Sequence, residues 1–169
     1  FKCIEYGTKW LSDTPDEKSK YPESSLNRIY TYALLERKSD GQRIMVINTH
    51  FDHESGVARE KQAVALMRYV NTITDYPVVL TGDFNCGASS KAYSNIVSSG
   101  MLTNSSTIAG NVITKGPTYT DYGTSNSTID FVFVTHKKIL VESYRVCNEK
   151  INGNYPSDHH PVLIEYTIY

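Results

Sequence analysis

An apolar strand, an amphipathic helix and a second apolar strand follow one another between residues 43 and 80. The first strand is expected over Arg43–Phe51, and the second begins at Val78. Between them, Ser55–Thr74 carries apolar residues at helical spacing, namely Ala63, Leu66, Met67, Val70 and Ile73. Tyr76-Pro77 ends the helix, because the residue before a proline is disfavoured in the helical region. This order favours a crossover between neighbouring parallel strands, and with it an α/β fold.

Both strands of this unit end in polar residues that can carry chemistry. His50 stands near the end of the first strand, and Asp83 and Asn85 follow the apolar run Val78–Leu80 of the second. Two residues apart on an extended segment, the carboxylate and the carboxamide point the same way. Such oxygen ligands suit a hard cation like Mg²⁺, and the amide can donate to a water or a phosphate. An Asx turn that only closes the strand is the alternative interpretation.

The rest of the chain is predicted to be mainly strands joined by polar loops. Further strands are expected over Phe1–Ser12, Asn27–Arg37, Thr128–Val134, Val141–Asn148 and His160–Tyr169. A second helix is expected over Ser90–Ser98, with Gly100 as its stop. Irregular segments are expected over Asp13–Ser25, Met101–Tyr122 and Glu149–Asp158.

Length and charge restrict the class of protein. A chain of 169 residues is expected to form one domain with a real core. The net charge is −1 and there is no run of Lys or Arg, so binding mainly through a large basic patch is not indicated. No apolar segment approaches the roughly 20 residues needed to span a bilayer. The three cysteines have no spacing typical of a disulfide framework or a zinc site.

Asp130 is the acid that most needs an explanation. It stands in the β-prone run Thr128–Val134, where burying an unpaired carboxylate is costly. A histidine is the natural partner, because an aspartate that accepts from one imidazole nitrogen leaves the other free for acid–base work. The candidate site residues at strand ends and loop edges are therefore His50, Asp83, Asn85, Asp130, Asp158 and His159.

Six stretches, taken in order, resemble the endonuclease/exonuclease/phosphatase superfamily, the group of deoxyribonuclease I. They are Lys9–Pro15, Asn48–His53, Thr81–Asn85, Pro117–Tyr119, Ile129–Phe133 and Ser157–Val162, and they cover nearly the whole chain. The resemblance implies an α/β (α+β) fold: part of a four-layer α/β/β/α sandwich of the deoxyribonuclease I-like type, with mixed sheets and helices outside. It also implies metal-dependent hydrolysis of phosphate esters.

The resemblance assigns a role to each candidate residue. Asp83 and Asn85 are similar to the pair that holds metal and positions the attacking water or the phosphate, and Asp158 is similar to a metal ligand. His159 resembles the catalytic imidazole, with Asp130 as its orienting acid. His50 resembles a second imidazole that contacts the phosphate, and Arg28 a phosphate-contacting group. In the same comparison Arg59 and Gln62 resemble helix residues that support the His50 strand, whereas His53, His136 and His160 are assigned to structure or surface.

One part of the family pattern is missing from this chain. Family members carry an early strand ending in Asn and another ending in a Gln-Glu pair, whose Glu is a principal metal ligand. Neither is present, and the first residue is Phe1, so residues 1–169 are interpreted as a single catalytic-domain fragment, roughly the C-terminal three-fifths of the family domain. The expected cofactor is Mg²⁺ or Mn²⁺, bound weakly because that Glu is absent. Exposed sheet surface and open strand edges are also expected, with a possible homodimer through those edges.

The sequence leaves the function open at two levels. A non-catalytic binding or scaffold module with a degenerate site is the alternative to a phosphoesterase. Within the enzyme class, the phosphate-ester substrate could be a nucleic acid, a sugar or inositol phosphate, or a lipid headgroup. Substrate choice in such folds depends on loops, and none of the loops here carries a readable code.

Overall fold

The computed structural model describes residues 1–169, whose nine strands form two sheets. The larger sheet has the order β1-β2-β3-β4-β7-β5, and the smaller has the order β6-β8-β9. The strands are β1 (Lys2–Trp10), β2 (Ile29–Glu36), β3 (Arg43–His50), β4 (Val78–Asp83), β5 (Thr103–Asn104), β6 (Asn111–Thr114), β7 (Asp130–Val134), β8 (Ile139–Val146) and β9 (Val162–Ile168). The helices are α1 (Gly56–Val70), α2 (Lys91–Val97) and α3 (Ser105–Ile108), with a 3-10 turn η1 at Asp121–Gly123.

The predicted crossover is present, because β3 and β4 are parallel neighbours joined through α1. Ser55 begins the helix as its N-cap, and its side chain accepts a hydrogen bond from the backbone N–H of Ala58. The helix ends at Val70, earlier than the predicted Thr74. Ile73 is nevertheless buried, because a turn in which its N–H donates to the Val70 carbonyl folds it back into the core. The apolar spacing therefore continues past the last helical residue.

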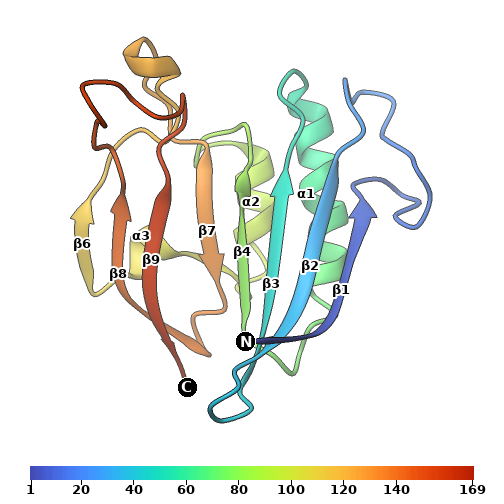
Figure 1. The fold of residues 1–169 in the computed structure, drawn as a ribbon. Helices are drawn as coiled ribbons and strands as arrows, with labels where there is room; N and C mark the ends of the chain where they lie inside the picture. Colours follow the sequence, from blue (N-terminus) through green and yellow to red (C-terminus); the bar gives the residue numbers. More distant parts are fainter.

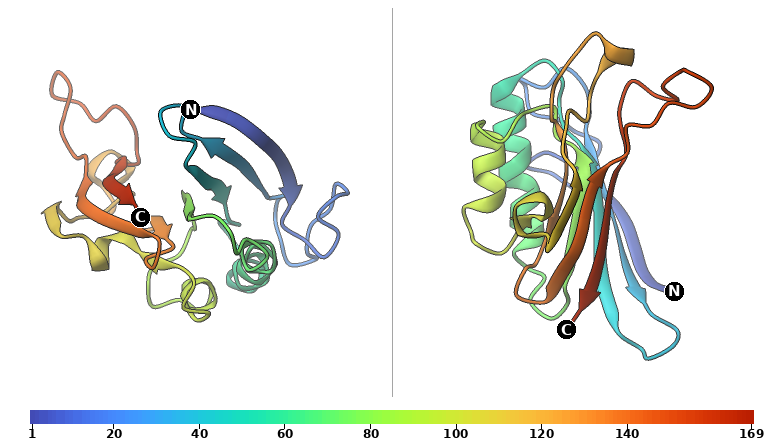
Figure 2. Two further views of the ribbon diagram at one scale, coloured as in Figure 1. Left: turned by 90° about the horizontal axis from the view of Figure 1, so that it is seen from below. Right: turned by 90° about the vertical axis from the view of Figure 1, so that its left-hand side faces the viewer.

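Helices α1 and α2 cover one face of the larger sheet, as Figures 1 and 2 show. The main core lies between this face and the helices, and its buried residues include Ile47, Leu66, Leu80, Phe84 and Phe133. No helix of the chain combines the length and the apolar character needed to cross a bilayer.

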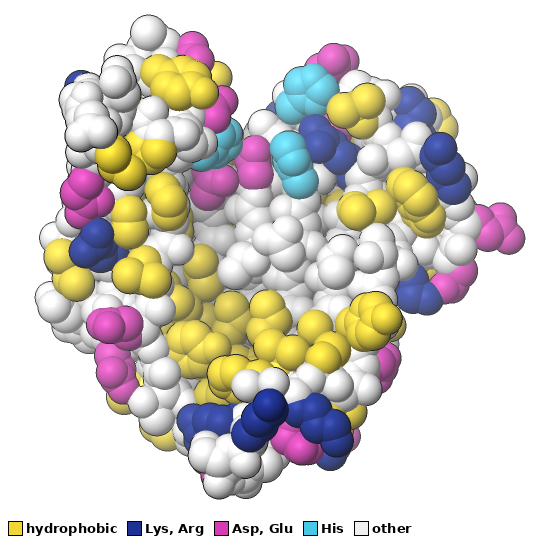
Figure 3. Space-filling view, in the orientation of Figure 1, with side chains coloured by type: hydrophobic (Ala, Val, Ile, Leu, Met, Phe, Trp, Pro, Cys, Tyr) yellow, Lys and Arg dark blue, Asp and Glu magenta, His cyan; other side chains and the backbone are white.

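The opposite face of the larger sheet carries no helix. Beside β7 the smaller sheet stands at an angle, and a second cluster joins the two sheets through Ile44, Val79, Val132, Val134, Ile139 and Val141. Figure 3 shows hydrophobic side chains across the lower part of this hollowed face. Tyr6 on β1 and Leu163 on β9 are 79% and 49% exposed. The prediction of exposed sheet surface is confirmed for these residues, and β1 and β9 also end their sheets.

The prediction of an irregular segment over Met101–Tyr122 was wrong for residues 103–108 and 111–114. The segment contains β5, α3 and β6 in succession. β5 pairs with β7, and β6 pairs in parallel with β8. These short elements are stabilised by strands distant in the sequence, which a local pattern of Thr, Ser, Asn and Gly does not reveal.

Candidate active site

The strand register places three of the predicted site residues side by side. His50 at the end of β3 is in register with Asp83 at the end of β4, and Asp83 is in register with Asp130, the first residue of β7. Residues paired in this way project from the same face of a sheet. The Nε2 atom of His50 lies 3.3 Å from Oδ2 of Asp83. The three side chains therefore form a row across the edge of the sheet.

His159 meets this row from the segment that leads into β9. A bridge pairing with Tyr119 holds its backbone, and the two rings pack with their centres 4.9 Å apart. Its Nδ1 is hydrogen-bonded to Oδ2 of Asp130 at 2.8 Å, and its Nε2 lies 4.0 Å from Oδ2 of Asp83. Asp130 thus has the histidine partner that its position in the sequence calls for.

The surroundings of these groups shift their pKa values in different directions. Burial raises the pKa of Asp83, and the charge of Asp130 adds to this shift. Burial lowers the pKa of His50, and the Arg28 guanidinium lowers it further. Burial alone would lower the pKa of His159 too, but the hydrogen bond and the charge of Asp130 outweigh it and raise the pKa above its ordinary value. His159 is therefore the more readily protonated of the two imidazoles.

Three of the side chains form a group that fits a divalent cation. One ligand atom from each of Asp83, Asp130 and His159 lies within 4.8 Å of the others, and all three residues are partly exposed. Carboxylate oxygens are the ligands that Mg²⁺ and Mn²⁺ prefer. The pKa of Asp83 is raised by burial and by its neighbour Asp130, a repulsion that a bound cation would relieve.

The row lines a cleft with a volume of about 470 Å³. In Figure 3 histidine and acidic side chains gather around the notch in the upper part of the molecule. Asn48 and His160 line the same cleft, although the sequence did not indicate either. Strand alternation was the available signal for Asn48, because it stands two residues before His50. His160 is only 5% exposed, and its Nδ1 has no hydrogen-bond partner, so it is a wall of the cleft and not a surface residue.

Asn85 is held at the end of β4 by hydrogen bonds to Asp83 and Phe51. Its backbone has a φ of 48°, in the left-handed region that asparagine tolerates better than most residues. Its N–H donates to Oδ1 of Asp83 at 2.8 Å, and its Nδ2 donates to the carbonyl of Phe51 at 3.0 Å. This arrangement fixes one carboxylate oxygen of Asp83 and joins the ends of β3 and β4.

Two further predicted residues lie beside the row and not in it. The carboxylate of Asp158 accepts a hydrogen bond from Ser157 Oγ at 3.2 Å and is not one of the three closely spaced ligand groups. Arg28 has its Nη2 atom 3.3 Å from Nδ1 of His53, and its Nε is buried without a partner. The guanidinium is nevertheless close enough to affect the pKa of His50, after the larger effect of burial.

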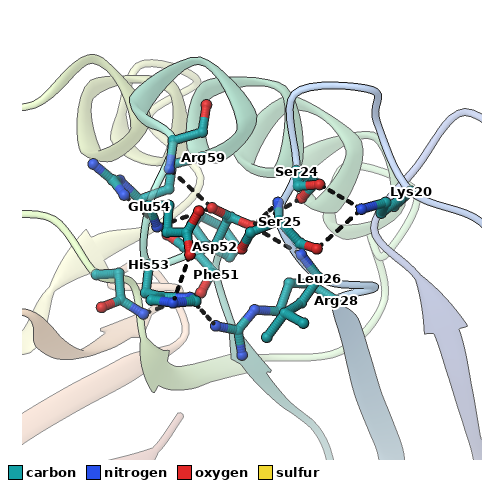
Figure 4. A network of polar contacts seen from close by, with 12 residues as sticks. Lys20, Ser24, Ser25, Leu26, Arg28, Phe51, Asp52, His53, Glu54 and Arg59 are labelled. Carbon is teal, nitrogen blue, oxygen red and sulfur yellow. Dashed lines mark hydrogen bonds and ion pairs between the residues drawn. The ribbon is translucent and has the colours of Figure 1, made fainter.

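A buried polar network fixes the turn that follows β3, as Figure 4 shows. Asp52 is fully buried and accepts hydrogen bonds from the backbone N–H groups of Ser25 at 2.7 Å and Ser55 at 2.9 Å. The side-chain oxygen of Gln62 accepts a hydrogen bond from the backbone N–H of Asp52 at 2.8 Å. The Arg59 guanidinium donates to the backbone carbonyl of Asp52 at 2.9 Å. The two helix residues therefore support the end of β3, as their resemblance implied.

Known proteins share both the sequence pattern and the fold of this chain. Residues 44–163 match the family model described as endonuclease–reverse transcriptase. Two solved structures from Bacteroides thetaiotaomicron align with nearly the whole chain. An endonuclease/exonuclease/phosphatase family protein is 30% identical with a TM-score of 0.91, over 98% of this chain and 65% of that one. A mannosyl-6-phosphatase is 29% identical with a TM-score of 0.90, over 99% of this chain and 67% of that one.

Curated relatives match over a smaller share of their own length. Nocturnin of Drosophila melanogaster is 26% identical over 84% of this chain, which spans 28% of that protein. Nocturnin of Rattus norvegicus is 24% identical over 83% of this chain, which spans 37% of that protein. The matched family model covers most of the chain. The row of His50, Asp83 and Asp130 lies within the matched residues, and so does His159. The chain belongs to the endonuclease/exonuclease/phosphatase family.

Proposed function

We propose that this chain carries the hydrolytic centre of a metal-dependent phosphoesterase. One observation supports this most directly: His159 is hydrogen-bonded to Asp130 while its other nitrogen faces the Asp83 carboxylate at the cleft. A phosphate ester needs a water placed for attack, charge neutralisation on the phosphoryl oxygens and a proton for the leaving oxygen. The row offers groups for each of these tasks.

In this proposal His159 is the acid–base residue and Asp130 orients it. Asp130 accepts a hydrogen bond from Nδ1 of His159. It thereby determines which imidazole nitrogen carries the proton and leaves Nε2 turned toward the cleft. A positioned imidazole of this kind contributes about 10²–10⁴-fold to the rate. The raised pKa of His159, for which the Asp130 hydrogen bond and charge outweigh burial, suits a group that gives a proton to a leaving oxygen near neutral pH.

His50, Arg28 and Asn85 are the proposed phosphate contacts. His50 lies at the cleft, half exposed, with its Nε2 close to Asp83. The positive charge of Arg28 acts on the same imidazole, so an anionic phosphate placed between them would be attracted by both. Asn85 Nδ2 donates one hydrogen to the Phe51 carbonyl and has a second one for a phosphate oxygen, whereas its side-chain oxygen can only accept and suits the metal ion.

The proposed cofactor is Mg²⁺ or Mn²⁺. The family resemblance assigns Asp83, Asn85 and Asp158 to it, and Asp130 adds a carboxylate close to Asp83. When bound, such an ion would neutralise charge on the phosphoryl oxygens and lower the pKa of a water. The chain spans about two thirds of the related bacterial structures and lacks the family's Gln-Glu pair. We therefore expect weak metal binding and low activity from this chain by itself.

Among phosphate esters we propose a sugar phosphate monoester as the substrate class. The mannosyl-6-phosphatase aligns with nearly the whole chain, including the cleft. The net charge of −1 does not favour a long polyanion held along its backbone. Nucleic acid, inositol phosphate and lipid headgroup esters are the alternative substrate classes, and a model phosphodiester represents the diesters among them in the test.

The test measures phosphate release from mannose 6-phosphate and hydrolysis of bis-nitrophenyl phosphate, each with and without Mg²⁺. We expect release that requires the metal and is lost in His159→Ala. His136→Ala is the matched control, because the His136 ring is hydrogen-bonded to Thr103 and does not line the cleft. Hydrolysis that survives His159→Ala would contradict the assignment.

A second readout does not depend on activity. Mn²⁺ is paramagnetic and should broaden the NMR signals of His159 more than those of His136, and Asp83→Asn should remove the difference. Equal broadening of both histidines would contradict the metal site.

Light scattering tests the predicted homodimer through the free edges of β1 and β9, and a monomer over a wide concentration range would contradict it.

A further inference from the structure

A second cavity lies between the larger sheet and α1, and it shares no residue with the cleft. Its volume is about 540 Å³, within the range of roughly 300–1,000 Å³ usual for small-molecule sites. We call it the tyrosine pocket, after Tyr30 and Tyr32 of β2 and Tyr69 of α1, which line it. Its charged lining residues are Lys9, Asp13, Asp16 and Arg68.

The three tyrosines that line this pocket pack against one another. The rings of Tyr30 and Tyr32 each pack against Tyr69, with ring centres 5.1 Å apart in both pairs. The ring planes are tilted by 33° in the Tyr30–Tyr69 pair and by 43° in the Tyr32–Tyr69 pair. The hydroxyls of Tyr21 and Tyr93 have side-chain partners in the chain, whereas those of the three pocket tyrosines have none.

The position of Tyr30 makes this lack of partners significant. The residue is only 4% exposed, and burial raises its pKa to about 12. A polar group in such surroundings normally has a hydrogen-bond partner. The Tyr30 hydroxyl has no partner in the chain, yet it is not an enclosed atom, so it opens onto the pocket. A ligand hydroxyl would supply the missing partner.

A glycine in β1 makes room for the ring of Tyr32. Gly7 is paired with Tyr32 in the β1–β2 register. A Cβ atom at Gly7 would lie 2.8 Å from the Tyr32 hydroxyl, too close for an unstrained contact. The absence of a Cβ atom at Gly7 leaves space for the Tyr32 ring, and this ring forms one wall of the pocket.

The charges at the pocket are already paired. Lys9 forms an ion pair with Asp16, and Arg68 donates to Asp13 at 3.0 Å. An anion would face both carboxylates, and a cation would compete with Lys9 and Arg68. Neither sign of charge is favoured, so the pocket suits a neutral ligand.

We propose that the tyrosine pocket binds a neutral saccharide at a site separate from the phosphate cleft. A sugar offers several hydroxyls that both donate and accept, as the three tyrosine hydroxyls require. The proposal stands apart from the hydrolytic function, because the two sites have no residue in common.

The test titrates the protein with methyl mannoside and methyl glucoside and follows tryptophan fluorescence. Trp10 is the only tryptophan of the chain and lines the pocket, so the signal reports on this site. We expect a saturable change with a Kd in the millimolar range, about −4 kcal/mol at the 1 M standard state. Choline and inorganic phosphate, as a cation and an anion, should give no saturable change.

Tyr30→Phe, Tyr32→Phe and Tyr69→Phe remove only the hydroxyls. Each should weaken saccharide binding about fivefold, the effect of one typical hydrogen bond, without lowering thermal stability. Tyr122→Phe, at a residue that is 63% exposed and not part of the pocket, and His159→Ala are the controls and should bind as the wild type does. The proposal is overturned if no saccharide gives a saturable signal, if the three pocket variants bind with wild-type affinity, if His159→Ala loses binding, or if choline binds in place of sugar.

Discussion

Nδ1 of His159 lies 2.8 Å from Oδ2 of Asp130, while its Nε2 lies 4.0 Å from the carboxylate of Asp83. The first distance is a hydrogen bond, and the second is too long for one. Asp130 therefore fixes the orientation of the imidazole, and Asp83 acts on it only through its charge. Nε2 is left without a hydrogen-bond partner at the cleft, where a water or a substrate oxygen can reach it.

The first prediction concerns Asp130→Asn, which keeps the shape of the side chain and removes its charge. Burial already acts to lower the pKa of His159, and the hydrogen bond and charge of Asp130 overcome it. The variant should therefore bring the pKa of His159 down, which NMR titration of the imidazole C–H signals measures. Hydrolysis should fall by about 10²–10⁴-fold. Asp75→Asn, at an exposed acid that does not line the cleft, is the control. An unchanged His159 pKa in Asp130→Asn would refute the pairing.

The second prediction is the order in which the two cleft histidines titrate. The pKa of His50 is lowered by burial and by Arg28, whereas that of His159 is raised by Asp130 against the effect of burial. NMR should show His50 titrating below the ordinary value of 6.5 and His159 above it. His159 then contributes stability that is fully present below that value and lost as the pH rises through its folded pKa. His50 has the opposite effect, with stability lost as the pH falls from 6.5 toward its lower folded pKa.

Urea unfolding between roughly pH 5 and pH 8 checks these signs. Relative to the wild type, His50→Ala should lose less stability on acidification, and His159→Ala should lose less as the pH rises. His136→Ala, at a histidine that does not line the cleft, is the control for removing an imidazole elsewhere. A His50 pKa higher than the His159 pKa would contradict the prediction.

Local patterns in the sequence were sufficient for most of the elements. The apolar runs that end at His50 and Asp83 are β3 and β4, and the periodic segment between them is α1. These patterns depend on one face being buried, which the sequence records directly. The need of Asp130 for a partner was also predictable, because a carboxylate in a β-run is costly to bury unpaired, and a histidine was the natural choice.

The register and the long-range contacts were not predictable in this way. That His50, Asp83 and Asp130 are directly opposite one another follows from the pairing of β3, β4 and β7. A shift of one residue would have turned one side chain to the other face, and nothing local excludes it. The same reason applies to β5 and β6, whose partners are distant in the sequence.

The third prediction is that Gly82→Ala destabilises the protein because it pushes apart two strands of the site. A Cβ atom at Gly82 would lie 2.3 Å from the carbonyl oxygen of Thr49, a backbone atom that cannot move without β3. We expect a loss of about 3 kcal/mol or more in the free energy of unfolding, measured in urea. Gly116→Ala is the matched control, because nothing lies within 4 Å of that position. Equal stability of the two variants would show that β3 and β4 adjust freely.

The fourth prediction concerns Asp52, which joins the turn after β3 to the segment that leads into β2. Burial alone would raise its pKa, but hydrogen bonds from Ser55, Ser25 and Glu54 outweigh it and hold the pKa far below its ordinary range. Asp52→Ala would leave the backbone N–H groups of Ser25 and Ser55 buried without an acceptor. The expected loss is on the order of 3 kcal/mol in the free energy of unfolding.

The acid dependence of stability separates the charge of Asp52 from its packing. A carboxylate with a lowered folded pKa contributes stability that is present above its unfolded value of about 3.9 and is lost as the pH falls below it. Asp52→Asn keeps the size of the side chain but has no such titration, so its stability should fall less steeply than that of the wild type on acidification. Asp75→Asn, at an exposed residue, is the control for removing a carboxylate elsewhere in the chain. An Asp52→Asn curve parallel to the wild type would mean that the turn beside His50 is held by shape and not by this carboxylate.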